Sequence, residues 1–213
     1  MGVFFVTTVL HRKRKTKAPC PKCFLHKNLC ICELIPKLNL STRLILVVHA
    51  KELKRTTNTG RLALLALENS KMFVRGSEHS RLDLSSILTE DFDSLLFYPC
   101  EEAMELESYL RTREVGSAGA QKPIQLIVPD GNWRQASKVA IRHPELKNLQ
   151  RVQITSANLA AQHLRKEHFP EGLSTLEAIA LAYEAIEGPL VGQQLKDIYR
   201  AKLNATLKGR GGG

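Results

Sequence analysis

From residue 41 onward, buried-type hydrophobic runs alternate with segments whose apolar residues recur at helical spacing. We predict strands over residues 43–50, 94–99, 123–130 and 149–155, because these are short apolar runs bounded by polar residues. We predict helices over residues 60–70, 101–113, 132–143 and 174–188, where the apolar positions follow a helical period. This alternation indicates an α/β fold with a largely parallel sheet and helices on both faces.

Three polar segments follow predicted strands or open predicted helices. They are TNTGR (57–61), DGNW (130–133) and LSTLEA (173–178). In parallel sheets ligands bind beyond the carboxyl ends of the strands, and helix N-termini suit carboxylates and phosphates. These segments are therefore candidate binding turns.

Each segment also has a purely structural interpretation. Ser174 and Glu177 fit a capping box, and Asn132 with Gln135 can cap the helix after DGNW. Gly60 can serve a turn that needs a positive φ angle. The pattern alone leaves both interpretations open.

Four of the five cysteines lie in CPKCFLHKNLCIC, with the spacing C-x2-C-x6-C-x-C. Four thiolates so close together can surround one tetrahedral zinc ion, which predicts a structural zinc knuckle. The candidate ligands are Cys20, Cys23, Cys30 and Cys32. A redox pair at Cys20 and Cys23, or four incidental thiols, are the alternatives. Cys100 is expected to be a buried small residue.

Charge favours an anionic partner such as nucleic acid. The 213 residues carry 31 Lys and Arg against 21 Asp and Glu, a net charge of +10. The apolar run at residues 1–10 is too short to span a bilayer and precedes a basic cluster, so we expect a cytoplasmic protein without a membrane segment. The expected organisation is a basic flexible tail (1–19), the zinc knuckle (20–40), an α/β catalytic domain (41–208) and a disordered glycine-rich tail (209–213).

Together the motifs resemble the DTW-domain family of tRNA-uridine aminocarboxypropyltransferases. The resemblance rests on the cysteine array, TNTGRLA at 57–63, the D-x-T-W-like DGNW and STLEA at 174–178. It covers nearly the whole chain from residue 20 to about 190. One departure is Asn132, where the family pattern has Thr. The resemblance implies a SPOUT-like α/β domain with a knotted C-terminal half.

The resemblance further implies transfer of the 3-amino-3-carboxypropyl group of S-adenosylmethionine to N3 of a uridine in tRNA. Uracil N3 is a poor nucleophile until it loses its proton, so a carboxylate within reach is needed, and Asp130 is the candidate base. The implied cofactor-binding residues are Thr59, Gly60, Ser174 and Thr175 for the amino-acid end, Val128 and Ile154 near the adenosyl end, and Asn132 and Trp133.

The aromatic and basic residues have alternative roles. Trp133, the single tryptophan, either offers its face to a base or sulfonium or packs its helix on the sheet. Arg61 is a candidate partner for a carboxylate or phosphate, and His49, Glu52 and Arg55 flank the same turn. The basic tail, the knuckle and cations around the cleft are expected to dock tRNA through its phosphates. A SPOUT-like methyltransferase and a non-catalytic zinc-containing RNA-binding protein remain alternatives, and the sequence leaves the oligomeric state open.

Overall fold

The structure is a computed structural model that describes residues 18–76, 82–116, 121–155 and 173–211. The described residues form one six-stranded sheet in the order β2-β1-β5-β3-β6-β4, and each neighbouring pair is parallel. The strands are β1 (Arg43–His49), β2 (Ser70–Arg75), β3 (Asp93–Phe97), β4 (Met104–Glu105), β5 (Ile124–Asp130) and β6 (Gln150–Gln153). The predicted α/β architecture with a parallel sheet is confirmed.

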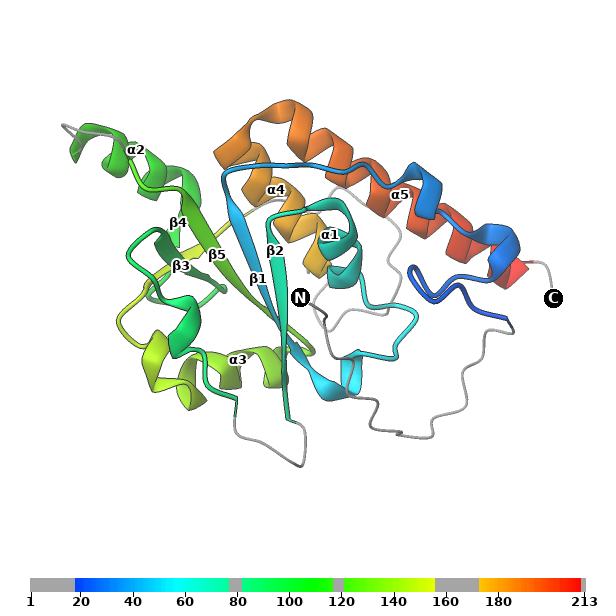
Figure 1. The fold of residues 1–213 in the computed structure, drawn as a ribbon, viewed down its shortest axis with the longest axis horizontal. Coiled ribbons are helices and arrows are strands. Elements are labelled where there is room, and N and C mark those ends of the chain that lie inside the picture. Colours follow the sequence, from blue (N-terminus) through cyan, green and yellow to red (C-terminus); the bar gives the residue numbers. More distant parts are fainter. Residues whose placement is uncertain (1–17, 77–81, 117–120, 156–172, 212–213) are drawn as a thin grey trace.

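Helices connect the strands and cover the sheet (Figure 1). The described α-helices are α1 (Gly60–Ala66), α2 (Leu106–Gly116), α3 (Trp133–Arg142), α4 (Thr175–Glu187) and α5 (Pro189–Gly211). Short 3-10 helices occupy Lys27–Leu29, Cys32–Leu34, Ala50–Glu52, Ser85–Ile87 and Pro144–Leu146. No described helix combines the length and the hydropathy needed to cross a bilayer.

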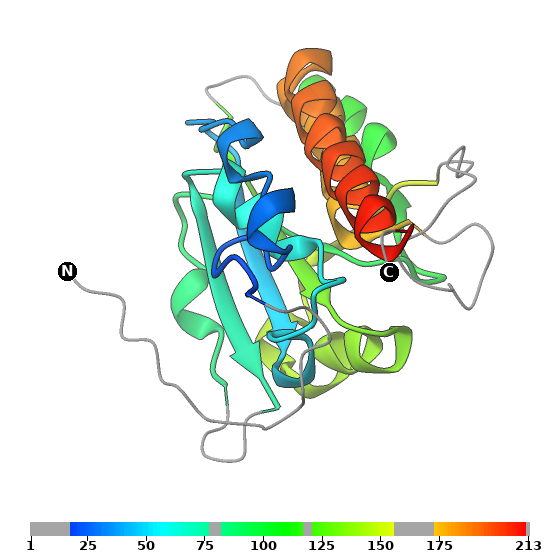
Figure 2. The same ribbon diagram turned by 90° about the vertical axis from the view of Figure 1, so that its right-hand side faces the viewer.

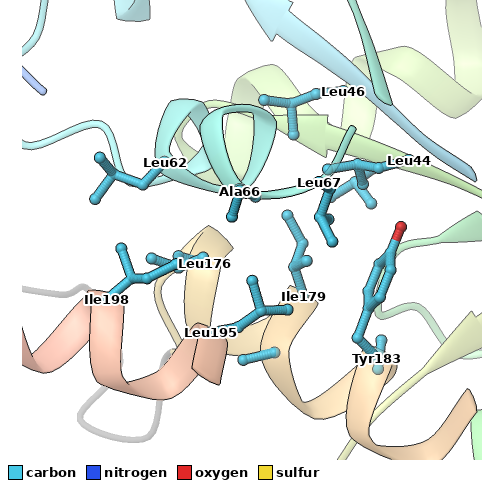
Figure 3. Close-up of a cluster of buried hydrophobic side chains, with 14 of the residues drawn as sticks. Leu44, Leu46, Leu62, Ala66, Leu67, Leu176, Ile179, Tyr183, Leu195 and Ile198 are labelled. Atoms are coloured by element: carbon cyan, nitrogen blue, oxygen red, sulfur yellow. The ribbon is translucent and has the colours of Figure 1, made fainter. Parts of the chain in front are cut away.

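Successive side chains of the central strand β1 enter two separate cores, because side chains alternate across a strand. Leu44 and Leu46 belong to the larger core, which α1, α4 and α5 cover. Figure 3 shows α1 packed between the sheet and the two C-terminal helices. Ile45 and Val47 belong to the smaller core, which α3 covers. Helices on both faces are therefore confirmed, and β1 and β5, buried on both sides, fit their almost unbroken apolar sequences.

Two edge strands were not predicted. The helix expected over 60–70 ends at Ala66, and Ser70–Arg75 forms β2 beside β1. The helix expected over 101–113 begins only at Leu106, because Met104–Glu105 pair with β6 as β4. Both strands are partly exposed, and β4 has only two residues, so they lack the apolar run that revealed the central strands.

Both ends of the chain are more structured than expected, as far as the described residues show. Pro19 pairs with His26 in an isolated antiparallel bridge, inside the segment expected to be a flexible tail. Helix α5 continues to Gly211, which lies within the segment 209–213 for which we expected disorder. The glycine sequence disfavours a helix, but Gly209 lies against Leu29, close enough that an added Cβ would be 3.2 Å from Leu29 Cδ1. The basic residues 1–17 lie outside the described residues.

Candidate functional site

The three polar segments singled out from the sequence meet at the carboxyl-terminal edge of the sheet. Asp130 is the last residue of β5, Gly60 opens α1, and Thr175 opens α4. The strand ends that form this edge lie at the lower side of Figure 1. This is the edge at which parallel α/β sheets bind ligands.

Asp130 is the centre of a hydrogen-bonded network. Its Oδ1 accepts a 2.7 Å hydrogen bond from Thr175 Oγ1, and its Oδ2 accepts one of 2.5 Å from Asn58 Nδ2. Asp130 is only 6% exposed, and Asn58 is buried as well. A buried carboxylate is costly unless donors compensate it, and these two donors do so. We call Asn58, Thr59, Asp130 and Thr175 the Asp130 network.

Asn58 and Thr59 extend this network into the starts of two helices. Asn58 Oδ1 accepts a 3.2 Å hydrogen bond from the backbone N–H of Arg61 in α1. Thr59 Oγ1 accepts a 3.2 Å hydrogen bond from the backbone N–H of Leu176 in α4. Sequence reasoning had selected Thr59 and Gly60 but missed Asn58, although an Asn near a helix start that accepts from the backbone N–H three residues later is a capping signal.

Gly60 is needed for space rather than for an unusual backbone angle. The positive φ angle considered for it is wrong, because among the described glycines only Gly76 and Gly188 have one. A Cβ at Gly60 would lie 3.0 Å from Leu46 Cδ2 and 3.1 Å from Asp130 Oδ2. The missing side chain therefore lets α1 approach the carboxylate closely.

The capping predictions for the other two helices are confirmed. Asn132 Oδ1 accepts from the backbone N–H of Gln135 (2.9 Å), and Gln135 Oε1 accepts from that of Asn132 (2.8 Å). Ser174 and Glu177 make the same reciprocal pair at α4. Since Thr is also an N-cap residue, Asn132 can replace the family's Thr in this structural task.

Trp133 does not pack α3 onto the sheet as a core residue. It is 56% exposed, and its ring lies 5.4 Å from that of Tyr98 at an interplanar angle of 35°. Tyr98 belongs to the core under α3, whereas Asp130 bonds to α1 and α4 partners on the opposite face. Asp130 and Trp133, the two ends of the DGNW segment, thus contact residues on opposite faces of the sheet. Tyr98, at the end of a predicted strand, was not singled out from the sequence.

Val128 and Ile154 flank the end of β3. Val128 lies within β5 and is buried in the larger core, two residues before Asp130. Ile154 follows β6 directly and packs against the same core while remaining partly exposed. Because β3 lies between β5 and β6, Val128 and Ile154 lie on either side of the end of β3.

The residues around the TNTGR turn have structural partners. His49 Nδ1 accepts a 3.2 Å hydrogen bond from the backbone N–H of Lys51, and Arg55 pairs with the buried Glu52 at 3.2 Å. The guanidinium of Arg61 lies 3.5 Å from the centroid of the Phe24 ring. His49 is therefore a hydrogen-bonded histidine at the end of β1.

The four clustered cysteines converge on one point. All four sulfur atoms lie within 4.8 Å of one another, with Cys20 Sγ 3.6 Å from Cys32 Sγ and 3.5 Å from Cys30 Sγ. Sulfur atoms around a tetrahedral zinc at about 2.3 Å are roughly 3.8 Å apart, so the geometry suits such an ion. Burial opposes ionisation of the Cys20 thiol, but hydrogen bonds with the backbone of Cys23 and Lys22 outweigh it and lower its pKa to about 6. The four residues can therefore hold one metal ion.

The cysteine segment is attached to the C-terminal half of α5 (Figures 1 and 2). Lys202 Nζ donates a 2.7 Å hydrogen bond to the carbonyl oxygen of Cys23, and Lys202 is 1% exposed. Burial lowers the pKa of Lys202 to about 8. Phe24 of the same segment contacts Arg61 of α1. Because the backbone N–H of Arg61 also bonds to Asn58, Arg61 links the knuckle to the Asp130 network.

Fold and site together define an α/β protein with a polar network at the carboxyl-terminal edge of its parallel sheet and an attached segment whose four cysteines can hold a metal ion. The chain belongs to the DTW domain family, since a family model described as "DTW domain" matches residues 17–207.

Curated relatives in three animals carry the name "tRNA-uridine aminocarboxypropyltransferase 2". The chain is 27% identical to the Macaca fascicularis protein over 81% of this chain and 58% of that relative. It is 27% identical to the Mus musculus protein (84% and 59%) and 29% identical to the Drosophila melanogaster protein (79% and 66%). The chain thus spans about three fifths of the mammalian relatives it matches. No solved structure matches it.

Proposed function

We propose that this protein transfers the 3-amino-3-carboxypropyl group of S-adenosylmethionine to N3 of a uridine in tRNA and releases 5′-methylthioadenosine. The names of the curated relatives support the reaction class. The observation that carries the proposal is the meeting of three motif segments, TNTGR, DGNW and STLEA, in one buried network around Asp130.

Asp130 is the proposed general base. Its two oxygens accept hydrogen bonds from Thr175 and Asn58, and a carboxylate oxygen can accept more than one hydrogen bond. Asp130 accepts the N3 proton as the new nitrogen–carbon bond forms and the carbon–sulfur bond of the donor breaks. Asn58 and Thr175 hold the carboxylate in position, which is the pre-organisation that proton transfer needs.

The hydroxyl groups at the start of α4 fit the amino-acid end of S-adenosylmethionine, which supplies an activated carbon next to a sulfonium. Ser174 Oγ accepts from the backbone of Glu177 and retains its O–H to donate to a carboxylate. Thr175 Oγ1 donates to Asp130 and retains lone pairs for an ammonium. Both residues are partly exposed, whereas Thr59 and Gly60 are buried and support them from behind.

For the adenosyl end, we retain the strand ends around Val128 and Ile154 as the proposed location. Asn132 and Trp133 border this edge at the start of α3, and both are exposed. The SPOUT-like resemblance implies a knotted C-terminal half, and residues 156–172 of that half lie outside the described residues. The knot stays a prediction.

We propose that the four cysteines hold a structural zinc ion. Four thiolates leave no open coordination position, so the metal stabilises the knuckle instead of taking part in the chemistry. A thiolate metal site is typical of a reducing compartment, which agrees with the expected cytoplasmic location.

The test is nucleoside mass spectrometry of unmodified tRNA incubated with the purified protein and S-adenosylmethionine, with methylthioadenosine measured in parallel. Equal amounts of aminocarboxypropyl-uridine and methylthioadenosine are expected, and neither should form when the donor is omitted. A methylated nucleoside would replace the proposal with a methyltransferase. Bound donor without any product over a full set of tRNAs would replace it with a non-catalytic RNA-binding protein.

A further inference from the structure

Helix α3 carries a row of cations along its outer face. Arg134, Lys138 and Arg142 are four residues apart, so they lie in one row that spans about 12 Å. Arg134 and Arg142 are exposed, and Lys138 is partly exposed. The sequence of α3, WRQASKVAIR, contains no acidic residue that could neutralise them. Core packing needs only the opposite face, where Ala136 and Val139 are buried.

Cations from β2 and from the segment after β1 adjoin this row. Arg75, at the end of β2, donates a 2.8 Å hydrogen bond to the carbonyl oxygen of Gln135 in α3. Burial lowers the pKa of Arg75, and the charge of Arg142 lowers it further. Burial also lowers the pKa of His49, with added effects from Arg75, Lys51 and Lys138. Arg75 thus joins the end of β2 to α3, and the cations at the ends of β1 and β2 lie close enough to those of α3 to act on one another.

An acidic residue near the end of β1 is already paired. Glu52, which partly offsets the effect of the cations on His49, is buried and forms an ion pair with Arg55. Glu52 is therefore engaged elsewhere and does not neutralise the exposed cations of α3. We define the α3 cation surface as Lys51, Arg134, Lys138 and Arg142, with Arg75 beneath it.

An aromatic platform stands at the start of the same row. Trp133 precedes Arg134 directly, is 56% exposed and lies against the buried Tyr98. Tyr98 supports the indole from the protein side, which keeps it in place at the rim. A supported, exposed aromatic ring beside a row of cations is the combination that binds single-stranded nucleic acid, where bases stack and phosphates pair.

We propose that the α3 cation surface binds the phosphate backbone of the substrate RNA and that Trp133 stacks on one of its unpaired bases. This inference rests on the proposed function, and it assigns the RNA to the α3 side of the sheet edge. The Asp130 network, on the α1 and α4 side, is then approached across the end of β5. RNA would thus reach the site from the face opposite to the residues that hold the donor's amino-acid end.

The phosphate-binding role of the cations is tested by measuring the binding of a tRNA transcript in the absence of S-adenosylmethionine. Binding is monitored by fluorescence anisotropy at several salt concentrations. The test variant is Arg134→Gln/Lys138→Gln/Arg142→Gln. The matched control is Lys71→Gln/Arg111→Gln/Lys122→Gln, which removes the same charge from exposed positions in β2, α2 and the segment before β5. The test variant should bind at least tenfold more weakly, and its log K against log salt slope should fall by about 2 to 3. Equal losses in both variants would overturn the docking surface.

The stacking part uses Trp133 itself, because it is the only tryptophan of the chain. Single-stranded RNA should quench the protein's tryptophan emission, whereas a fully paired RNA duplex should quench it much less. Trp133→Ala should weaken RNA binding roughly 5- to 150-fold. RNA binding without quenching, and with full affinity in Trp133→Ala, would exclude the platform.

Failure of this surface is distinguishable from failure of the proposed reaction. A test variant that retains wild-type binding and turnover overturns the surface and leaves the transfer activity intact. If the wild type makes no methylthioadenosine, but the test variant loses RNA binding and the control variant does not, the RNA-binding surface is supported and the proposed transfer activity is overturned. Tighter binding to phosphatidylserine vesicles than to RNA, lost in the same test variant, would assign the surface to a membrane and refute the proposal.

Discussion

Thr175 Oγ1 at the start of α4 donates a 2.7 Å hydrogen bond to Asp130 Oδ1 at the end of β5, 45 residues earlier in the chain. Asn58, just before α1, bonds to the other oxygen of the same carboxylate. One buried side chain thereby joins a strand end to the starts of two helices. Any substitution of Asp130 must consequently be tested for its effect on structure as well as on chemistry.

Asp130→Asn should lower the rate of transfer by roughly 10² to 10⁴ while leaving affinity for S-adenosylmethionine nearly unchanged. Asn has the same shape, and its oxygen can accept from Asn58 while its amide faces Thr175 Oγ1, which can accept. The network survives, but the amide cannot take up a proton. Single-turnover kinetics and calorimetry on the same preparation measure the two quantities.

The control for that experiment is Asp130→Ala, which removes both side-chain hydrogen bonds to Asp130. It leaves the buried Asn58 amide without this acceptor, at about 1 to 3 kcal/mol for the unsatisfied group, whereas the partly exposed Thr175 hydroxyl can bond to water. Urea unfolding should show the loss in Asp130→Ala and only a small one in Asp130→Asn. Wild-type turnover in Asp130→Asn would remove the base assignment and leave Asp130 a purely structural role.

Gly60→Ala should lower both stability and activity. The new methyl group would lie 3.0 Å from Leu46 Cδ2 and 3.1 Å from Asp130 Oδ2, and neither buried neighbour can move freely. Overpacking costs about 1 to 3 kcal/mol, more than the roughly 1 kcal/mol that Ala gains over Gly in a helix. Displacement of the carboxylate should reduce turnover tenfold or more. Denaturant unfolding and initial rates measure both effects.

A second substitution separates the two contacts of that methyl group. Adding Leu46→Val removes one crowded atom. The double variant should therefore lose less free energy of unfolding than the sum of the losses in the two single variants. Turnover should stay low, because the contact with Asp130 remains. Recovery of turnover together with stability would show that crowding against Leu46, and not displacement of Asp130, caused the loss.

The sequence predicted the central elements of the fold because their burial dictates their composition. Strands β1 and β5, buried on both faces, have almost unbroken apolar sequences, and the capping boxes at Asn132 and Ser174 marked two helix starts. Strands β2 and β4 were not predicted, because edge strands tolerate polar residues and so lack a distinctive apolar pattern. Met104 and Glu105 extend a helix-like sequence, and only pairing with β6 makes them a strand.

For the site, sequence reasoning identified the segments but not their contacts. Cysteine spacing alone was enough to predict that four sulfur atoms converge, since the segment is short. The bonds from Asn58 and Thr175 to Asp130 join residues 72 and 45 positions apart, and no local pattern specifies them. The separation of Asp130 and Trp133 onto opposite sides of the sheet edge likewise depends on the helix that starts between them.

Cys23→Ser should abolish metal binding and lower stability, while turnover per folded molecule stays the same. Thiolate coordination supplies folding free energy, and Cys23 also lies where the knuckle contacts Lys202 of α5. Elemental analysis should find about one zinc per chain in the wild type and none in the variant. Thermal unfolding should show the variant melting earlier.

Cys100→Ser is the matched control, because Cys100 is the one cysteine outside the cluster. It should retain zinc and nearly all stability. A wild-type protein prepared without chelators and containing no zinc would refute the metal assignment. Equal loss of stability in both serine variants would show that the destabilisation does not depend on the metal.

His49 should make the protein less stable in mild acid. Burial and the nearby cations lower its pKa in the folded state, below the usual value of about 6.5. As pH falls below 6.5, the unfolded chain binds a proton that the folded chain resists, so the free energy of unfolding decreases. Protonation also removes the Nδ1 lone pair that caps the 3-10 helix Ala50–Glu52.

His49→Asn keeps a capping acceptor but does not titrate, so its stability should fall less between pH 7.5 and pH 5.5 in urea unfolding. Identical pH profiles for the two proteins would show that another group is responsible.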